Sequence, residues 1–133
     1  MQREDMLAKV EAAYAARRSG DFAKLSEIVA HDAEFTTAGD ETLVAALPGA
    51  RGAGVHGAAR ELFDTIELQT LDRMDAVAEG NRVAVLWRTT AARKGGEPFE
   101  TLMFDLWEFD GSGMICKGTQ FVDTAKFVEV MRG

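Results

Sequence analysis

The chain has 133 residues, of which 47% are hydrophobic and 28% charged. That balance is ordinary for a globular protein, and the length fits one domain spanning residues 1–133. The formal net charge is −7 and the isoelectric point is near 4.8. Such a charge argues against nucleic-acid binding, which needs a basic face, and against attraction to anionic lipid. We therefore expect a substrate that is neutral or apolar rather than polyanionic.

Few residues are suited to holding a metal or a disulfide. Cys116 is the only cysteine, so an internal disulfide or a cysteine-based zinc site is not possible. His31 and His56 lack partners at metal-ligand spacing, and we expect neither a metal nor a cofactor. No apolar run approaches the roughly 18 residues that cross a membrane, and no secretory signal is visible. These features predict a soluble, cytoplasmic protein with no membrane partner.

The first third of the chain is predicted to be helical. Apolar residues at helical spacing predict a helix over residues 3–18, with Tyr14 and Arg17 on its apolar stripe. Gly20 ends this helix and Asp21 can cap a second one, which runs to about Ala30.

The next segment has fewer periodic features. A short strand is expected over 33–37 and a third helix over about 57–68. Between them, residues 38–57 contain the breaker-rich run 47–54, which is typical of a mobile binding loop and equally of a tolerated surface insertion.

The second half is predicted to consist of strands. Short turns rich in glycine and polar residues separate four strands, and Asp123 precedes a last helix. Adjacent strands joined by short turns form an antiparallel sheet, and helices grouped before strands indicate an α+β fold. We expect the helices to cover the concave face of a curled sheet and to leave a pocket at its open end. The predicted strands cover residues 71–79, 83–93, 101–109 and 114–122.

Asp105 is the most informative residue. Side chains alternate along a strand, so Asp105 shares a face with Met103 and Trp107. A carboxylate there must be paired, hydrogen-bonded or kept neutral by a raised pKa. We expect desolvation to raise its pKa. Asp105 is then either a structural hydrogen-bonding residue or an acid or base for catalysis.

The same alternation predicts the residues that line the pocket. Most are apolar, with a few polar groups among them, as in a small-molecule site; the alternative is that they fill a core. His56 can approach a ligand from the end of the irregular segment, although a solvated histidine explains it as well. Asp105 is the candidate catalytic residue, and the candidate binding residues are Tyr14, Phe35, Thr37, Trp87, Thr89, Met103, Trp107, Gln120 and Val122.

Four segments, in order, resemble the NTF2-like superfamily in its ketosteroid isomerase-like and SnoaL-like polyketide cyclase branch. Residues 15–22 are similar to the break between the family's first two helices, and residues 30–35 to the beginning of its first strand. Residues 107–115 resemble its late hairpin and residues 121–125 its closing segment. The resemblance implies a cone-shaped α+β domain, on which many functions are found.

Ketosteroid isomerase residues carry over only in part. The oxyanion-hole aspartate, which an apolar site keeps protonated, falls on Asp105. The base aspartate falls on Thr37, which cannot accept a proton in its place. The tyrosine falls on Ala13, and one residue along a helix rotates a side chain by about 100°, which makes Tyr14 a poor substitute. Steroid isomerisation is therefore not expected.

Two related mechanisms are disfavoured by the same comparison. The acid/base aspartate on the last strand of SnoaL-like cyclases falls on Gln120, which holds a carbonyl or water but exchanges no proton. In the limonene-epoxide-hydrolase branch, the arginine falls on Met103 and the second aspartate falls on Gln120. Neither residue can replace its counterpart, so that mechanism is disfavoured as well.

Two functional classes stay open. The first is a cofactor-free enzyme of isomerase, cyclase or dehydratase type, acting through Asp105 on a small apolar carbonyl or hydroxyl compound. The second is a small-molecule-binding or dimerising module without catalysis.

The outer face of the Asp105 strand is predicted to form a homodimer interface, because it is too apolar to leave in water. The alternative is that the C-terminal helix covers it. The residues of this face are Leu86, Leu102, Phe104 and Leu106, extended by Ile115 and Phe121.

Overall fold

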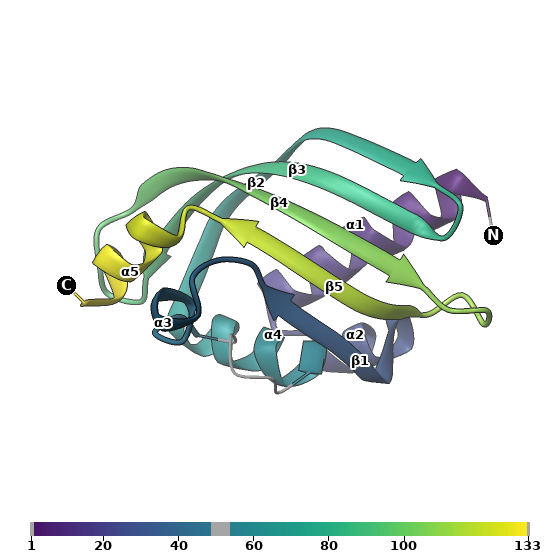
Figure 1. The fold of residues 1–133 in the computed structure, drawn as a ribbon, viewed down its shortest axis with the longest axis horizontal. Helices are drawn as coiled ribbons and strands as arrows, with labels where there is room; N and C mark the ends of the chain where they lie inside the picture. Colours follow the sequence, from purple (N-terminus) through teal and green to yellow (C-terminus); the bar gives the residue numbers. More distant parts are fainter. Residues whose placement is uncertain (1, 49–53, 133) are drawn as a thin grey trace.

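The computed structural model describes residues 2–48 and 54–132, drawn in Figure 1. Helices and strands follow the predicted order with one addition, the short helix α3. The helices are α1 (Arg3–Ser19), α2 (Phe22–Ile28), α3 (Glu41–Val44), α4 (Gly54–Thr65) and α5 (Thr124–Arg132). The strands are β1 (Val29–Thr37), β2 (Ile66–Glu79), β3 (Arg82–Arg93), β4 (Phe99–Phe109) and β5 (Ile115–Val122).

The five strands form one mixed sheet in the order β1-β5-β4-β3-β2. Strands β2 to β5 make the predicted antiparallel meander. Strand β1 pairs in parallel with β5 and places Phe35 beside Gly118. Irregularities in register interrupt β2 between Leu68 and Thr70 and again between Arg73 and Asp75. Bulges of this kind bend a strand and increase its twist, which suits the curved sheet.

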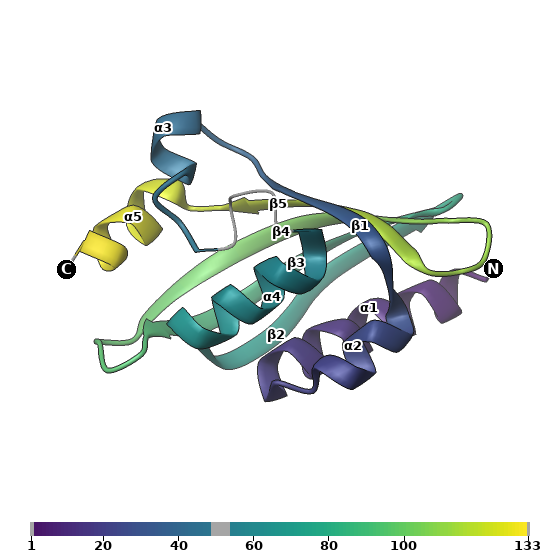
Figure 2. The ribbon, with the colours of Figure 1, turned by 90° about the horizontal axis from the view of Figure 1, so that it is seen from below.

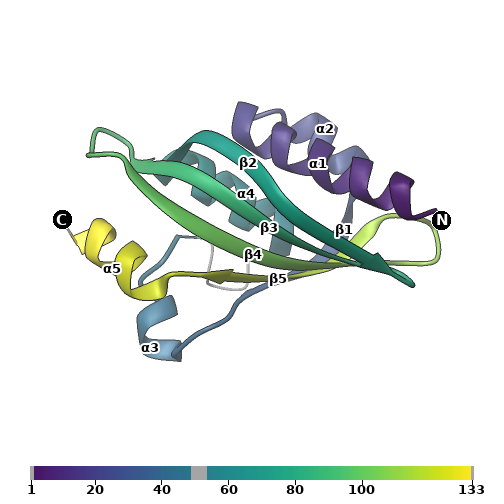
Figure 3. The same ribbon diagram turned by 90° about the horizontal axis from the view of Figure 1, so that it is seen from above.

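Helices lie on one face of the sheet. Figure 2 shows α1, α2 and α4 on the viewer's side of the sheet, and Figure 3 shows the opposite face with no helix across it. The core lies between these layers and includes Met6, Val10, Val83 and Val85, each at most 2% exposed. The α+β architecture with helices on the concave face is therefore confirmed.

Several boundaries differ from the predicted ones. The second helix ends at Ile28, and β1 begins at once with Val29. The third helix ends at Thr65, and β2 begins at Ile66, so the expectation of a helix to 68 was wrong. Ile66 and Leu68 are buried while their neighbours Glu67 and Gln69 are exposed, which is the alternation expected for the first residues of β2.

The irregular segment is shorter than expected. Helix α3 lies inside it, and Asp40 caps that helix by accepting hydrogen bonds from the amides of Thr42 and Leu43. Helix α4 begins at Gly54. Residues 49–53 of the glycine-rich run lie outside the described part of the chain.

The outer face of the sheet carries apolar side chains in the free chain. Leu102, Phe104 and Phe121 are 51%, 44% and 47% exposed, and the two phenylalanine rings lie 6.3 Å apart. Helix α5 packs beside α3 beyond the end of β5 and does not cover these residues (Figure 3). Ile115 does not belong to this face. It is 1% exposed, because an irregularity in the β4–β5 register reverses the facing of the first residue of β5.

Candidate functional site

Asp105 faces the interior, as predicted from its strand parity. Its side chain is fully buried. In the sheet it lies between Val85 on β3 and Gln120 on β5. An ionised carboxylate in this position requires compensation by hydrogen bonds or charge.

A single chain of hydrogen bonds connects Asp105 to two aromatic side chains. The Tyr14 hydroxyl of α1 donates to Asp105 Oδ2, and Trp107 Nε1 donates to the Tyr14 hydroxyl at 3.1 Å. Asp105 Oδ1 has no hydrogen-bond partner among the described residues. Tyr14 therefore reaches the carboxyl despite its one-residue offset from the family's tyrosine position.

Burial raises the pKa of Asp105 well above its ordinary value of 3.8. Smaller effects from Gln120 and from the Phe121 backbone act in the opposite direction. Neither group makes a hydrogen bond to Oδ1. Desolvation therefore dominates, and the neutral carboxylic acid is the favoured form.

Trp107 reaches Tyr14 because its ring crosses a glycine. Gly118 of β5 is paired with Trp107, and a Cβ atom at this position would overlap the indole ring. The ring also stacks on Phe35 of β1, with centroids 6.1 Å apart and planes 28° from parallel. A glycine at 118 is thus a steric requirement for this indole position.

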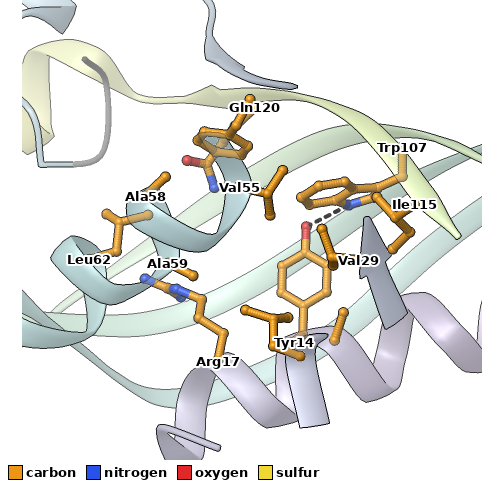
Figure 4. A pocket seen from close by; sticks show the side chains of 13 residues that line it. Tyr14, Arg17, Val29, Val55, Ala58, Ala59, Leu62, Trp107, Ile115 and Gln120 are labelled. Carbon is orange, nitrogen blue, oxygen red and sulfur yellow. Dashed lines mark hydrogen bonds between the residues drawn. The ribbon is translucent and has the colours of Figure 1, made fainter. Parts of the chain in front are cut away.

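Next to this network lies a mostly apolar cavity of about 50 Å³, lined by residues of α1, α2, α4, β1, β4 and β5 (Figure 4). A space of that size holds a few water molecules or part of a ligand. Asp105 does not line it, whereas Tyr14, whose hydroxyl donates to Asp105, does. The lining residues are Ala13, Tyr14, Arg17, Leu25, Val29, Phe35, Val55, Ala58, Ala59, Leu62, Trp107, Ile115 and Gln120.

Arg17 is the charged residue of the cavity wall, and it was not among the predicted binding residues. Its side chain is half-buried, and its Nε has no hydrogen-bond partner among the described residues. Burial lowers the pKa of the guanidinium to about 10, so that it stays charged at neutral pH. A signal was present in the sequence, since Arg17 lies on the apolar stripe of the first helix.

A second, smaller cavity of about 20 Å³ adjoins the first at Arg17, Leu62 and Gln120. Besides Gln120, three predicted binding residues line it: Thr37, Met103 and Val122. Gln120 thus contacts both spaces, and its amide Nε2 lies 4.0 Å from Met103 Sδ, a weak hydrogen bond at most.

Two other predicted binding residues, Trp87 and Thr89, do not line either cavity, and neither does His56, the possible ligand contact. Trp87 is buried behind Tyr14, with ring centroids 4.6 Å apart, and its Nε1 has no partner in the described structure. The Thr89 hydroxyl donates to the Thr70 carbonyl at 2.7 Å and ties β3 to β2. His56 Nε2 lies 3.1 Å from the Val29 carbonyl, and its ring contacts His31. These contacts account for Thr89 and His56 as structural residues.

Within residues 2–48 and 54–132 no group of three histidine, cysteine or acidic side chains is arranged to hold a metal ion. In the same part of the chain, no helix is sufficiently long and apolar to cross a membrane.

The sequence model of the SnoaL-like domain matches residues 10–117. The chain belongs to the SnoaL-like domain family. The match contains Tyr14, Arg17, Asp105 and Trp107, whereas Gln120 lies beyond it. No curated protein matches the chain significantly in sequence.

Solved structures show the same fold at low sequence identity. An NTF2-like protein from Burkholderia xenovorans is 20% identical over 98% of each chain, with a TM-score of 0.80. A candidate isomerase from Rhodopseudomonas palustris is 19% identical over 100% of this chain and 99% of its own, with a TM-score of 0.78. A candidate polyketide cyclase from Xanthomonas campestris is 16% identical over 97% and 98%, with a TM-score of 0.69. These likenesses establish the NTF2-like fold, while the activity must be argued from the site.

Proposed function

We propose that the protein is a cofactor-free acid/base enzyme of isomerase, cyclase or dehydratase type, acting on a small, largely apolar carbonyl or hydroxyl compound. The observation that carries the proposal is the buried Asp105–Tyr14–Trp107 network beside an apolar cavity. A hydroxyl donor in a water-poor site stabilises charge that develops on a substrate oxygen. The candidate isomerase and cyclase of the same fold are consistent with this chemistry.

In this mechanism the Tyr14 hydroxyl contacts the substrate oxygen and Asp105 acts behind it. The raised pKa of Asp105 favours its protonated form, which can give a proton to the Tyr14 oxygen as the Tyr14 proton leaves Oδ2 and passes to the substrate oxygen. Trp107 Nε1 donates to the same oxygen and stabilises negative charge on it. Gln120 and Thr37 orient the substrate from the two adjoining cavities. We expect Gln120→Ala to weaken binding with a smaller loss of rate.

A non-catalytic binding module is the second candidate. It is favoured by the absence of any carboxylate or imidazole base on the cavity walls in the described part of the chain. In an enzyme, a proton that leaves carbon must then pass to water or to a basic group of the substrate. Acid-assisted reactions, such as loss of water from a hydroxy ketone, suit these walls better than steroid isomerisation.

The test is exchange of carbon-bound hydrogen for deuterium, followed by NMR on small hydroxy ketones and aryl ketones. Asp105→Asn preserves the shape and removes the acid, so we expect exchange or dehydration to fall roughly 10²- to 10⁴-fold with affinity retained. Asp72→Asn, on an exposed residue of β2, is the matched control. Turnover that survives Asp105→Asn moves the chemistry to another residue. Binding without turnover in the wild type supports the binding module.

We further propose that the protein is a homodimer joined through the outer sheet face. Leu102, Phe104 and Phe121 form a continuous apolar patch on β4 and β5, and helix α5 lies away from it. A second copy of the chain buries this patch symmetrically, as in most homo-oligomers.

A further inference from the structure

Arg17 presents an unpaired positive charge to the cavity beside the Tyr14–Asp105 pair. No hydrogen bond or ion pair involves its guanidinium within the part of the chain that the structure describes. The buried carboxyl of Asp105 forms no ion pair with Arg17 in the described structure, and burial raises its pKa. A desolvated cation without a partner costs free energy, and replacing it with an apolar side chain is often stabilising. An anion bound beside Arg17 would offset this cost.

The position of Arg17 relative to Tyr14 defines where that anion would lie. The two residues are three apart on α1, so their side chains leave the same face of the helix one above the other. Figure 4 shows Arg17 and Gln120 entering the cavity from opposite walls, with Tyr14 and Trp107 at its other end. One end of the cavity therefore offers a hydroxyl and the other a guanidinium with an amide.

A surface pocket that shares Arg17 with the cavity is also basic. A surface pocket of about 290 Å³ is lined by Arg17, Arg18 and Lys94, against one carboxylate, Glu67. Arg18 is fixed there by hydrogen bonds to two backbone carbonyls of β2, including Leu68 O at 2.9 Å from its Nε. A local excess of positive charge in a chain of net charge −7 favours the approach of an anion at this point.

We infer that Arg17 binds the carboxylate of an otherwise apolar keto- or hydroxy-carboxylic acid, whose carbonyl or hydroxyl oxygen is held at Tyr14. The inference rests on the proposed function in taking the Tyr14 end as the reacting end. The guanidinium matches a carboxylate in charge and in its paired donors. Gln120 Nε2 supplies a further donor on the facing wall. Leu62, Val55 and Ala59 accommodate the apolar body between the two polar ends.

The test uses a matched pair of ligands, 4-oxo-4-phenylbutanoate and its neutral amide, titrated by calorimetry. We expect the wild type to bind the acid roughly tenfold to a hundredfold more tightly than the amide, the range of a charge-assisted hydrogen bond. Arg17→Met should abolish this preference and leave the affinity for the amide within about twofold, since only the charge contact is lost. Arg17→Lys should retain part of the preference. Arg82→Met, at an exposed position on β3, should retain all of it.

A second measurement separates a ligand-binding arginine from a structural one. Without ligand, Arg17→Met should have a Tm equal to or above that of the wild type, because it removes an unpaired buried cation. A lowered Tm, equal binding of acid and amide, a preference that survives in Arg17→Met, or no saturable binding of either ligand overturns the inference. Preference for the acid without deuterium exchange upholds Arg17 as the anion site and refutes catalysis. Deuterium exchange that depends on Asp105, without a preference for the acid, upholds catalysis and refutes Arg17 as the anion site.

Discussion

Each face of strand β4 departs from the usual distribution of polar and apolar side chains at particular residues. On the inner face, Asp105 is fully buried between Met103 and Trp107. On the outer face, Leu102 and Phe104 are about half exposed. A strand selected for stability alone would place the carboxyl on the exposed face and the phenyl ring on the buried face, because burying a carboxyl and exposing a phenyl ring both cost free energy.

The difference between the faces indicates two separate functional constraints on one strand. The inner face keeps a carboxyl neutral and hydrogen-bonded to Tyr14, which favours chemistry or ligand recognition. The outer face keeps an apolar patch, which favours association with a partner. Changes on the inner face should therefore alter stability and ligand binding, whereas changes on the outer face should alter assembly.

Gly118→Ala should have the largest effect, and it acts on the inner face. The added methyl overlaps the Trp107 ring, so the indole must leave Tyr14 or the strand must shift. We expect a loss of about 3 kcal/mol of unfolding free energy, measured by urea denaturation, with altered tryptophan fluorescence. Gly111→Ala is the control, because a Cβ there meets no atom within 4 Å. Equal stability of the two variants would contradict the tight packing of Trp107 over Gly118.

Phe104→Asp tests the outer face. Placing a charge in the centre of the proposed interface should weaken the dimer by about 2 kcal/mol, roughly thirtyfold, without unfolding the chain. Light scattering at micromolar concentration should report a dimer for the wild type and a monomer for the variant. Leu43→Asp, which changes an exposed residue of α3, should stay dimeric. A wild type that is monomeric in this experiment would refute the homodimer.

The smallest effect is a pH dependence that belongs to the inner face alone. The pKa of Asp105 is raised in the folded protein above its ordinary value of 3.8. Between these two pKa values the folded state binds more protons than the unfolded state, so stability falls as the pH rises, by at most about 1.4 kcal/mol per pH unit.

The amide in the Asp105→Asn variant does not titrate, so this variant should lose the fall of unfolding free energy with rising pH. We expect the variant to gain stability relative to the wild type as the pH rises from acid to neutral, in urea denaturation curves. Phe104→Asp compared at equal protein concentration should not show the same trend. A stability difference between wild type and Asp105→Asn that is constant with pH would mean that Asp105 is ionised in the folded protein.

Local patterns in the sequence predicted the features that depend on near neighbours. Strand parity placed Asp105, Met103 and Trp107 on the buried face, and glycine-rich turns separated the strands correctly. Gly20, with φ of 76°, ends α1 in the left-handed conformation that glycine favours. The alternation of Ile66, Glu67 and Leu68 also indicated a strand, but the helical period of the preceding residues obscured it.

Features set by distant pairing could not be predicted in the same way. The parallel pairing of β1 with β5 joins segments that are far apart in the chain, and no local pattern specifies it. The register irregularity after Glu108 reverses the facing of Ile115 and moves it from the expected outer face to the cavity. Arg17 was recognisable as a charge on an apolar stripe, but its lack of a partner depends on the whole surrounding structure.

The position of β1 at the sheet edge also has a consequence for how the chain folds. Within the described sheet, β5 is the only strand that pairs with β1, and Phe35 joins Gly118 in register. Strand β1 is synthesised first but cannot pair until β5 has been synthesised. Contacts between residues so distant along the chain are slow to form. The cavity wall built from Phe35, Ile115 and Gln120 is then among the final parts of the molecule to assemble, after the β2–β3 and β3–β4 hairpins have provided a surface for it.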